Sequence, residues 1–165
     1  MPTDARETRP RVPLRDEVWF TIADARARMR GAMNADSALG PLGLTLRSYT
    51  ILSMACTGND YSQREIGDFL SFDARQVVNL VDELEGLGYI TREPYPGDRR
   101  VNAIRATAEG ARVHATAREV MREREEKTLR DLSPAERTQL RTLLDRIRGC
   151  LQIRSHVRSR RRARR

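Results

Sequence analysis

The 165-residue sequence is poor in several residue types, and each shortage excludes a class of protein. Its two cysteines, Cys56 and Cys150, are too few for a disulfide framework and favour a reducing compartment. No apolar run is long enough to span a bilayer, and the polar N-terminus lacks the apolar segment of a secretory signal. We therefore expect a cytoplasmic protein that does not enter a membrane.

The sequence also offers little for catalysis or for metal binding. His114 has no histidine or cysteine three or four residues away, so no structural zinc site is expected. There is no Ser–His–acid set, no glycine-rich phosphate loop and no recognisable pair of catalytic carboxylates. We accordingly expect neither enzymatic activity nor a cofactor. Because aromatic residues make up only 5% of the chain, the core is expected to be aliphatic.

Positive charge is abundant but unevenly distributed. The chain carries a net charge of +8, and its last twelve residues, RSHVRSRRRARR, hold seven arginines and no acid. Without those seven charges, residues 1–153 carry only +1, and residues 62–105 carry −2, with six arginines against eight acids. Residues 154–165 are predicted to be a disordered tail. An argument for nucleic-acid binding by the rest of the chain must rest on individual arginines.

Residues 61–80, YSQREIGDFLSFDARQVVNL, contain two consecutive signals for the start of a helix. In each signal a capping residue is followed three positions later by Glu or Gln, which is the spacing of a capping box. The two pairs are Ser62 with Glu65 and Asp73 with Gln76. The first helix must end near Leu70, and the second runs at helical spacing to Gly88. This pattern is typical of a helix-turn-helix, although an ordinary pair of packed helices can share it.

The next segment favours the helix-turn-helix interpretation. After residue 89 the period changes to that of strands: ITRE is extended, YPGD is a turn, and RVNAIRA alternates. A β-hairpin directly after a helix-turn-helix makes a winged helix. We therefore predict a mainly α-helical protein whose winged helix-turn-helix lobe occupies residues 44–106.

The segments that flank this lobe are predicted to be helices with one apolar stripe and a charged back. They are residues 15–35 and 107–153, preceded by a flexible arm at 1–14. Their stripes could pack together within one chain, or against a second chain. Since DNA readers of this type are usually two-fold dimers, we predict a homodimer. The residues expected at its interface are Val18, Ile22, Leu140, Leu144, Ile147 and Leu151.

The exposed start of the second capped helix is the predicted reader of base edges. Arginine suits guanine, Gln or Asn suits adenine, and an apolar side chain can touch a thymine methyl group. A merely solvated polar face is the alternative. The residues in question are Arg75, Gln76, Val78 and Asn79. At the start of the first capped helix, unpaired backbone N–H groups could bind phosphate at Ser62, Gln63 and Arg64.

The predicted turn of the hairpin carries Asp98, Arg99 and Arg100. A carboxylate two residues from an arginine across a tight turn can orient the guanidinium. A narrow minor groove concentrates negative potential and attracts such an arginine. Arg99 is expected to meet phosphate. The alternative is an exposed turn without a function.

Three segments resemble the MarR family of transcriptional regulators: GPLGLTLRSYTIL at 40–52, FDARQVVNLVDELEGLGYI at 72–90 and PGDRRVNAIRATAEG at 96–110. The resemblance covers roughly residues 15–150. It implies a helical dimer with a winged helix in each subunit, and a cleft in which many relatives bind small aromatic acids. It also makes Arg100 the minor-groove probe and Asp98 its support. For the effector cleft we predict Trp19, Arg47 and Tyr49. The alternative, which the sequence favours, is that each is simply a core or interface residue.

The function predicted from these observations is that of a nucleoid-associated regulator, with repression as the expected mode. It would bind a pseudo-palindromic operator in double-stranded DNA as a homodimer, and a small aromatic effector could release it. The alternative is an architectural protein that binds nucleic acid without sequence preference through the arginine-rich tail.

Overall fold

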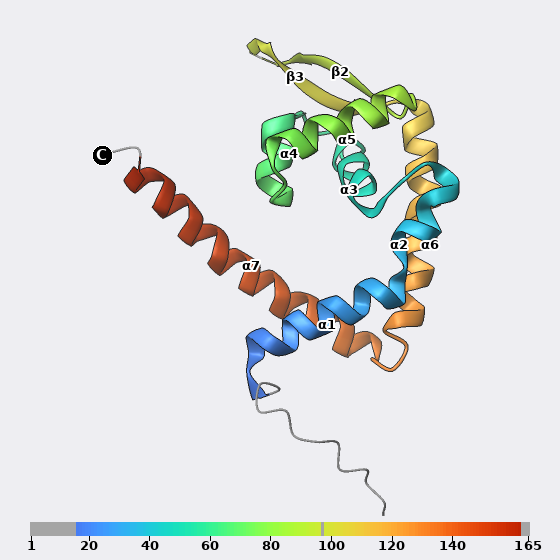
Figure 1. Ribbon diagram of the computed structural model, residues 1–165, viewed down its shortest axis with the longest axis vertical. Helices are drawn as coiled ribbons and strands as arrows, with labels where there is room; N and C mark the ends of the chain where they lie inside the picture. Colours follow the sequence, from blue (N-terminus) through green and yellow to red (C-terminus); the bar gives the residue numbers. More distant parts are fainter. Residues whose placement is uncertain (1–15, 97, 163–165) are drawn as a thin grey trace, which may run out of the picture. The chain divides into compact units, whose positions relative to one another are not determined.

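The computed structural model describes residues 16–96 and 98–162 (Figure 1). The chain divides into two compact units, one ending at Glu125 and one starting at Glu126. Its helices are α1 (Val18–Met33), α2 (Ala35–Leu39), the 3-10 helix η2 (Gly40–Leu42), α3 (Leu46–Ala55), α4 (Gln63–Leu70), α5 (Ala74–Gly86), α6 (Ala108–Thr128) and α7 (Pro134–Arg162). Its strands are β1 (Tyr61–Ser62), β2 (Ile90–Tyr95) and β3 (Asp98–Ala106). The predicted winged helix-turn-helix fold is confirmed.

Local capping chemistry explains where α4 and α5 begin. Ser62 Oγ accepts from the Glu65 N–H at 3.2 Å, and the Glu65 carboxylate accepts from the Ser62 N–H at 2.8 Å, so the capping box is complete. Ser71, in the left-handed conformation, ends α4. Asp73 Oδ1 then accepts from the Gln76 N–H at 2.8 Å and starts α5. Both predicted N-caps are confirmed.

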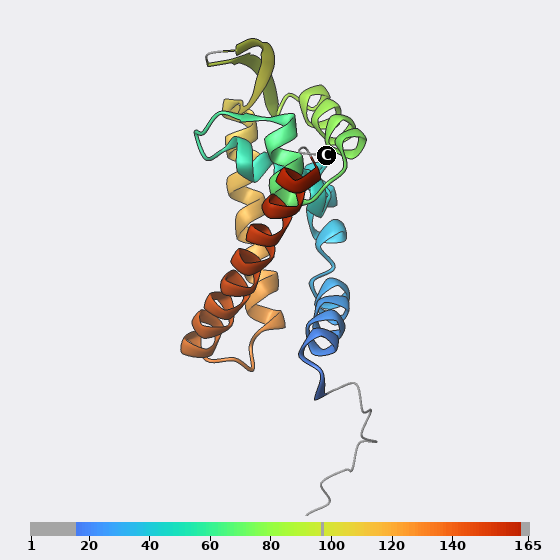
Figure 2. The same cartoon turned by 90° about the vertical axis from the view of Figure 1, so that its left-hand side faces the viewer.

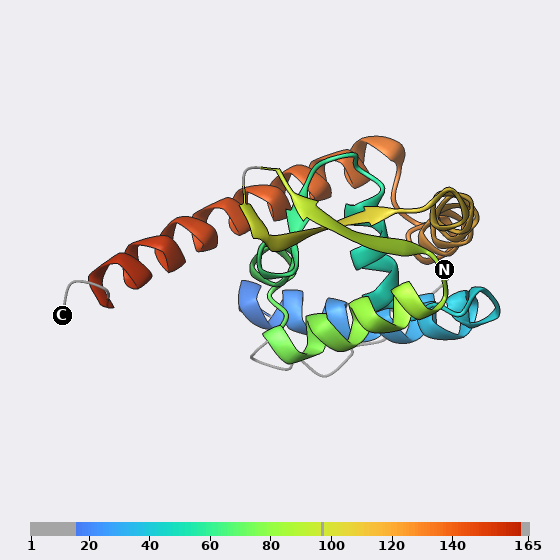
Figure 3. The same ribbon diagram turned by 90° about the horizontal axis from the view of Figure 1, so that it is seen from above.

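The wing is a three-stranded antiparallel sheet in the order β1-β3-β2. Strand β2 pairs with β3 from Ile90 opposite Ala106 onward, with an irregularity after Pro94. The short β1 adds the pair of Tyr61 with Ile104, which makes β3 the central strand. The C-terminal end of α5 leads directly into the hairpin, where the helix contacts β2 (Figures 1, 2 and 3). The pattern of residues 89–106 predicted the hairpin but did not reveal β1.

The unit that ends at Glu125 contains an aliphatic core between α3, α4, α5, the sheet and the first half of α6. The buried residues of this core are Leu39, Leu44, Ile51, Leu52, Met54, Ala55, Ile66, Val77, Val81, Leu84, Ile90, Ile104, Val113 and Ala117. None of them is aromatic, as the composition predicted. Leu87 follows the last helical residue of α5 and is 41% exposed, although the spacing of Leu84 and Leu87 predicts that both face the core.

The flanking helices differ from the predicted segments at their ends. Helix α1 is shorter than residues 15–35, and the chain then forms the short α2 and η2 before α3. Helix α7 starts at Pro134, after the Ser133–Glu136 capping box, and continues to Arg162, into the segment expected to be a disordered tail. Arginine is a good helix former, and residues 150–162 contain no glycine or proline that would end the helix. In the part of the chain that the structure describes, no helix combines the length and apolar character needed to cross a membrane.

Candidate nucleic-acid interface

The first turns of α5 present an exposed face. The buried residues Val77, Val81 and Leu84 recur at helical spacing and fix which side of α5 faces the core. The side chains of the predicted base readers lie on the rest of the surface. Arg75 and Asn79 are exposed, Val78 is 41% exposed, and Gln76 is half-buried beside its cap. The structure thus leaves the predicted reading face open to a DNA groove.

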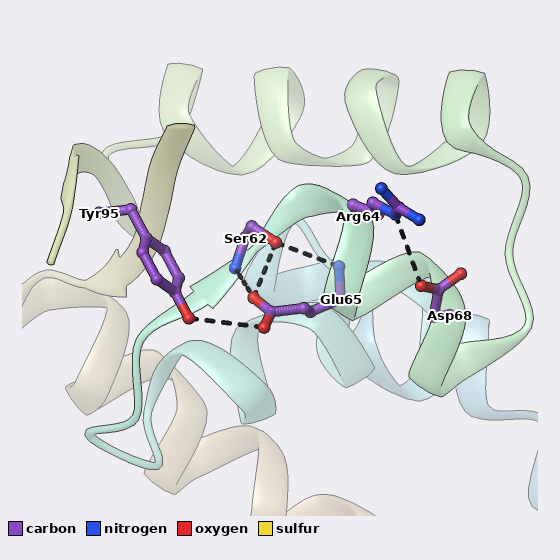
Figure 4. A network of polar contacts seen from close by, with 5 residues as sticks. All are labelled: Ser62, Arg64, Glu65, Asp68 and Tyr95. Carbon is purple, nitrogen blue, oxygen red and sulfur yellow. Dashed lines mark hydrogen bonds and ion pairs between the residues drawn. The ribbon is translucent and has the colours of Figure 1, made fainter. Parts of the chain in front are cut away.

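At the start of α4, the capping box uses part of the predicted phosphate site (Figure 4). The buried Ser62 hydroxyl donates to Glu65 Oε2 at 2.7 Å. The Ser62 backbone N–H and hydroxyl lower the pKa of the Glu65 carboxyl. Arg64 is exposed and lies 3.9 Å from Asp68 across one turn. Gln63 Nε2 is buried and, within the described residues, has no hydrogen-bond acceptor. Phosphate binding by Gln63 and Arg64 stays a prediction.

The structure describes the side chains of two of the three residues predicted to act at the tip of the wing. Asp98 Oδ1 accepts from the backbone N–H of Arg100 at 3.0 Å, and both residues are exposed. Asp98 therefore shapes the backbone from which Arg100 projects, whereas the sequence had suggested a contact with the guanidinium itself. The side chain of Arg99 lies outside the described part of the chain.

Contacts that the sequence did not reveal connect the wing to the helix-turn-helix. Arg92 on β2 forms ion pairs with Asp82 and Glu85, which lie one turn apart on α5. On the same strand, the Tyr95 hydroxyl lies 3.5 Å from Glu65 Oε1, as Figure 4 shows, and this carboxylate raises the pKa of Tyr95.

A second arginine, on β3, adds to these contacts. Arg105 pairs with Asp60 and, at 3.1 Å, with Glu93. The only sequence signal for such ties was the three-residue spacing of Asp82 and Glu85, because the position of β2 beside α5 is not a local property.

The three predicted effector residues have different neighbours. Trp19 is 61% exposed and makes an edge-to-face contact with Phe20, with ring centroids 5.8 Å apart. The Arg47 guanidinium lies 5.8 Å from the centre of the Phe72 ring. The ring of Tyr49 stacks on the imidazole ring of a histidine on α6.

That ring belongs to His114, whose centroid lies 5.7 Å from that of Tyr49. The Ser53 hydroxyl donates to the Tyr49 carbonyl at 2.8 Å, so it can only accept from His114 Nε2–H, 3.2 Å away. Burial, together with the charge of Arg118, lowers the pKa of His114. The lowered pKa favours the uncharged imidazole, and a hydrogen bond from Nε2–H to Ser53 requires the tautomer with its proton on Nε2. Among the described residues, no three His, Cys, Asp or Glu side chains gather closely enough to hold a metal ion.

The apolar stripes predicted for the dimer interface are exposed in the single chain. Val18 on α1 is 70% exposed, and Ile22 is 38% exposed. On α7 the exposed members are Leu140, Leu144 and Ile147, together with Leu143. The side chain of Leu151 lies outside the described part of the structure.

Comparison with known proteins gives one consistent result. Residues 42–101 match the family model described as MarR family. A MarR-family transcriptional regulator from Rhodococcus sp. RHA1 is 31% identical, with a TM-score of 0.73, and the match covers 81% of this chain and 95% of that one. CouR from Rhodococcus jostii RHA1, solved bound to p-coumaroyl-CoA, is 32% identical with a TM-score of 0.71, over 81% and 93% of the two chains.

A curated relative extends the likeness at lower coverage. The HTH-type transcriptional regulator PrsX of Escherichia coli is 29% identical over 103 residues. This match covers 61% of the chain and 61% of PrsX, so the chain spans less than two thirds of that relative.

Proposed function

Because the chain belongs to the MarR family of winged helix-turn-helix regulators, we propose that it is a sequence-specific DNA-binding repressor that acts at the nucleoid in the cytoplasm. The observation that carries the proposal is the arrangement of two exposed elements on one supported lobe. The start of α5 offers Arg75, Val78 and Asn79 to base edges in the major groove. The wing offers Arg100, on a turn held by Asp98, to the minor groove.

The protein is proposed to bind as a homodimer through α1, α6 and α7. The exposed leucines of α7 and its Ile147 support a second copy of this chain as the partner, because an isologous interface buries the same stripe from both chains. The operator is then an inverted repeat whose half-site centres lie roughly one helical turn, about 10 bp, apart.

A small aromatic ligand is proposed to release the protein from its operator. The relative CouR, solved with p-coumaroyl-CoA, supports an aromatic acyl group as the chemical class. In this chain, Tyr49 and His114 offer stacking surfaces, and Arg47 offers a positive charge for a carboxylate or phosphate. Trp19 remains a proposed member of this site.

Selection from a randomised duplex library tests the DNA-binding function without knowledge of the operator. We expect the full-length protein to enrich one inverted repeat, and footprinting should show protection of both half-sites. Replacing Arg75 and Asn79 by alanine should remove the enrichment while the fold remains intact. Enrichment of no sequence, or of a single asymmetric half-site, would overturn the proposal or its two-fold form.

A second function rests on the arginine-rich end of the chain, which holds seven of the arginines and no acid. An architectural protein would hold any DNA through these charges by releasing counterions. Deleting residues 154–165 separates the two functions. For a regulator, the deletion should weaken binding to the selected repeat and to a scrambled duplex by similar factors, and should flatten the salt dependence. Loss of all DNA binding would instead favour the architectural function.

A further inference from the structure

The C-terminal end of α5 is fastened to two segments that are distant in the sequence. Gly88 (φ 73°) turns the chain at this end, and the Tyr89 N–H then donates to the carbonyl of Leu84 at 3.0 Å. Tyr89 therefore follows the recognition helix without any flexible linker. Whatever holds Tyr89 also fixes the direction of α5.

The first fastening is to the start of α6. The Thr107 N–H donates to the Tyr89 carbonyl at 3.0 Å, and the Thr107 hydroxyl donates to the Gly88 carbonyl at 2.7 Å. The same Thr107 oxygen caps α6 by accepting from the Gly110 N–H at 2.9 Å. The backbones approach so closely that a Cβ atom on Gly110 would lie 1.9 Å from the Tyr89 carbonyl oxygen.

The second fastening is to the segment between α2 and α3. The Tyr89 hydroxyl donates to the carbonyl of Leu42 at 3.1 Å, across 47 positions of sequence. Gly43 follows in the left-handed conformation, and a Cβ atom there would lie 3.5 Å from a methyl group of Leu87. This segment continues from α1 through α2, so Tyr89 contacts the chain on its way from α1 as well as the start of α6.

We propose that Tyr89 is a positioning residue that sets the direction of the recognition helix against the segments leading from α1 and into α6, and thereby the half-site spacing that the dimer accepts. The inference rests on the proposed function, because α1 and α6 are there assigned to the dimer. When two recognition helices bind one operator, the second binding step is intramolecular, and its effective concentration falls when the geometry is less well fixed. Binding of one lobe to one half-site does not contain this step.

The test is Tyr89→Phe in the full-length protein, because this change removes the hydrogen bond to Leu42 and keeps the ring. Three probes are used: the inverted repeat selected from a random library by the wild-type protein, repeats with one to three base pairs inserted or removed at the centre, and a duplex with a single half-site. We expect affinity for the selected repeat to fall roughly three- to tenfold, the size of one net hydrogen bond, while half-site affinity changes less than about twofold. Discrimination against the altered spacings should also weaken.

Tyr61→Phe is the matched control. It removes a tyrosine hydroxyl whose partner is Asn59, two positions away, so it leaves the joint intact. We expect this variant to keep the wild-type spacing profile. Thermal unfolding of both variants measures any general loss of stability. Such a loss does not by itself change which half-site spacing the protein prefers.

Two results would overturn the inference. A wild-type spacing profile for Tyr89→Phe would show that the hydroxyl positions nothing. Equal losses on the half-site and on the full repeat would show that it supports only the lobe. If the wild-type protein selects no repeat at all, the proposed function fails first, and this inference fails with it.

Discussion

The winged-helix lobe and the flanking helices α1 and α7 differ in how much of their apolar surface is buried. The lobe encloses its own core, in which Ile51, Leu52 and Ile66 are fully buried. In α1 no residue is buried, and Leu144 of α7 remains 44% exposed. The core of the lobe is thus complete within one chain, whereas the stripes of the flanking helices stay exposed. The proposed reading of DNA and the proposed assembly therefore rest on different regions of the chain.

The largest effect is expected from substitutions that prevent the proposed dimer from forming while the lobe stays folded. Replacing Leu144 and Ile147 by Asp withdraws two apolar side chains from each subunit, at about 1.5–3 kcal/mol per side chain, and adds charges. We expect monomers by analytical ultracentrifugation and a folded lobe by thermal unfolding. Thr142→Asp places the same charge on the opposite side of α7 and should leave the dimer unchanged. A dimer that survives the double substitution would exclude this interface.

The next effect breaks the lobe instead. Gly110→Ala puts a methyl group against the Tyr89 carbonyl, so the start of α6 has to move. We expect a loss of about 3 kcal/mol in the free energy of unfolding, the upper end of typical overpacking costs, measured by chemical denaturation. Gly86→Ala is the control, because its Cβ has no neighbour within 4 Å; it should change stability by less than ~1 kcal/mol. Near wild-type stability for Gly110→Ala would contradict the observed close approach.

A smaller effect should leave both regions folded and change only reading. Arg100→Ala is expected to weaken binding to the selected repeat by about 1–3 kcal/mol, and to weaken binding to scrambled DNA much less. Arg100→Lys keeps the charge but loses the planar fork, so it should restore only the unspecific part. Titrations on both duplexes at several salt concentrations measure the difference. Equal losses on both duplexes would reduce Arg100 to a phosphate contact.

The smallest expected effect concerns the acid dependence of stability, for which each region offers one capping box. Hydrogen bonds from Ser62 lower the pKa of Glu65, and those from Ser133 lower the pKa of Glu136. A lowered pKa in the folded state means that the contribution is present above the unfolded value of about 4.3 and is lost as the pH falls through the folded value.

Glu65→Gln should therefore flatten the acid dependence of lobe stability below about pH 5. The change should be less than ~1 kcal/mol because solvent screens the interaction of the exposed Glu65 carboxylate with Ser62. Thermal unfolding of the lobe between neutral and acidic pH measures this change. Glu136→Gln should leave the acid dependence of the lobe as it is. An unchanged slope for Glu65→Gln would show that this carboxylate titrates alike in both states.

What the sequence could predict follows from the range of the forces involved. The starts of α4 and α5 depend on atoms three residues apart, so Ser62 and Asp73 were sufficient to place them. The exposed face of α5 followed from the helical period. The ties of Arg92 and Tyr95 depend on how a strand lies beside a helix, and no local pattern encodes that position.

Two further differences have similar physical causes. Strand β1 has only two residues, too few for an alternating pattern, and it exists because β3 offers a free edge. The end of α7 was predicted to be disordered because of its charge density. Its helical backbone agrees better with the helix propensity of arginine and with the absence of a helix-breaking residue.

The carboxylates that hold Arg92 and Arg105 also affect how the protein would find its operator. Both arginines are neutralised within the lobe, so they are not available to grip the phosphates of random DNA. With these two cations held, the lobe would release fewer counterions from random DNA, so its own share of unspecific binding would be smaller. In the proposed regulator, the preference of the lobe for one sequence over another would then depend mainly on the fit of α5 and the wing.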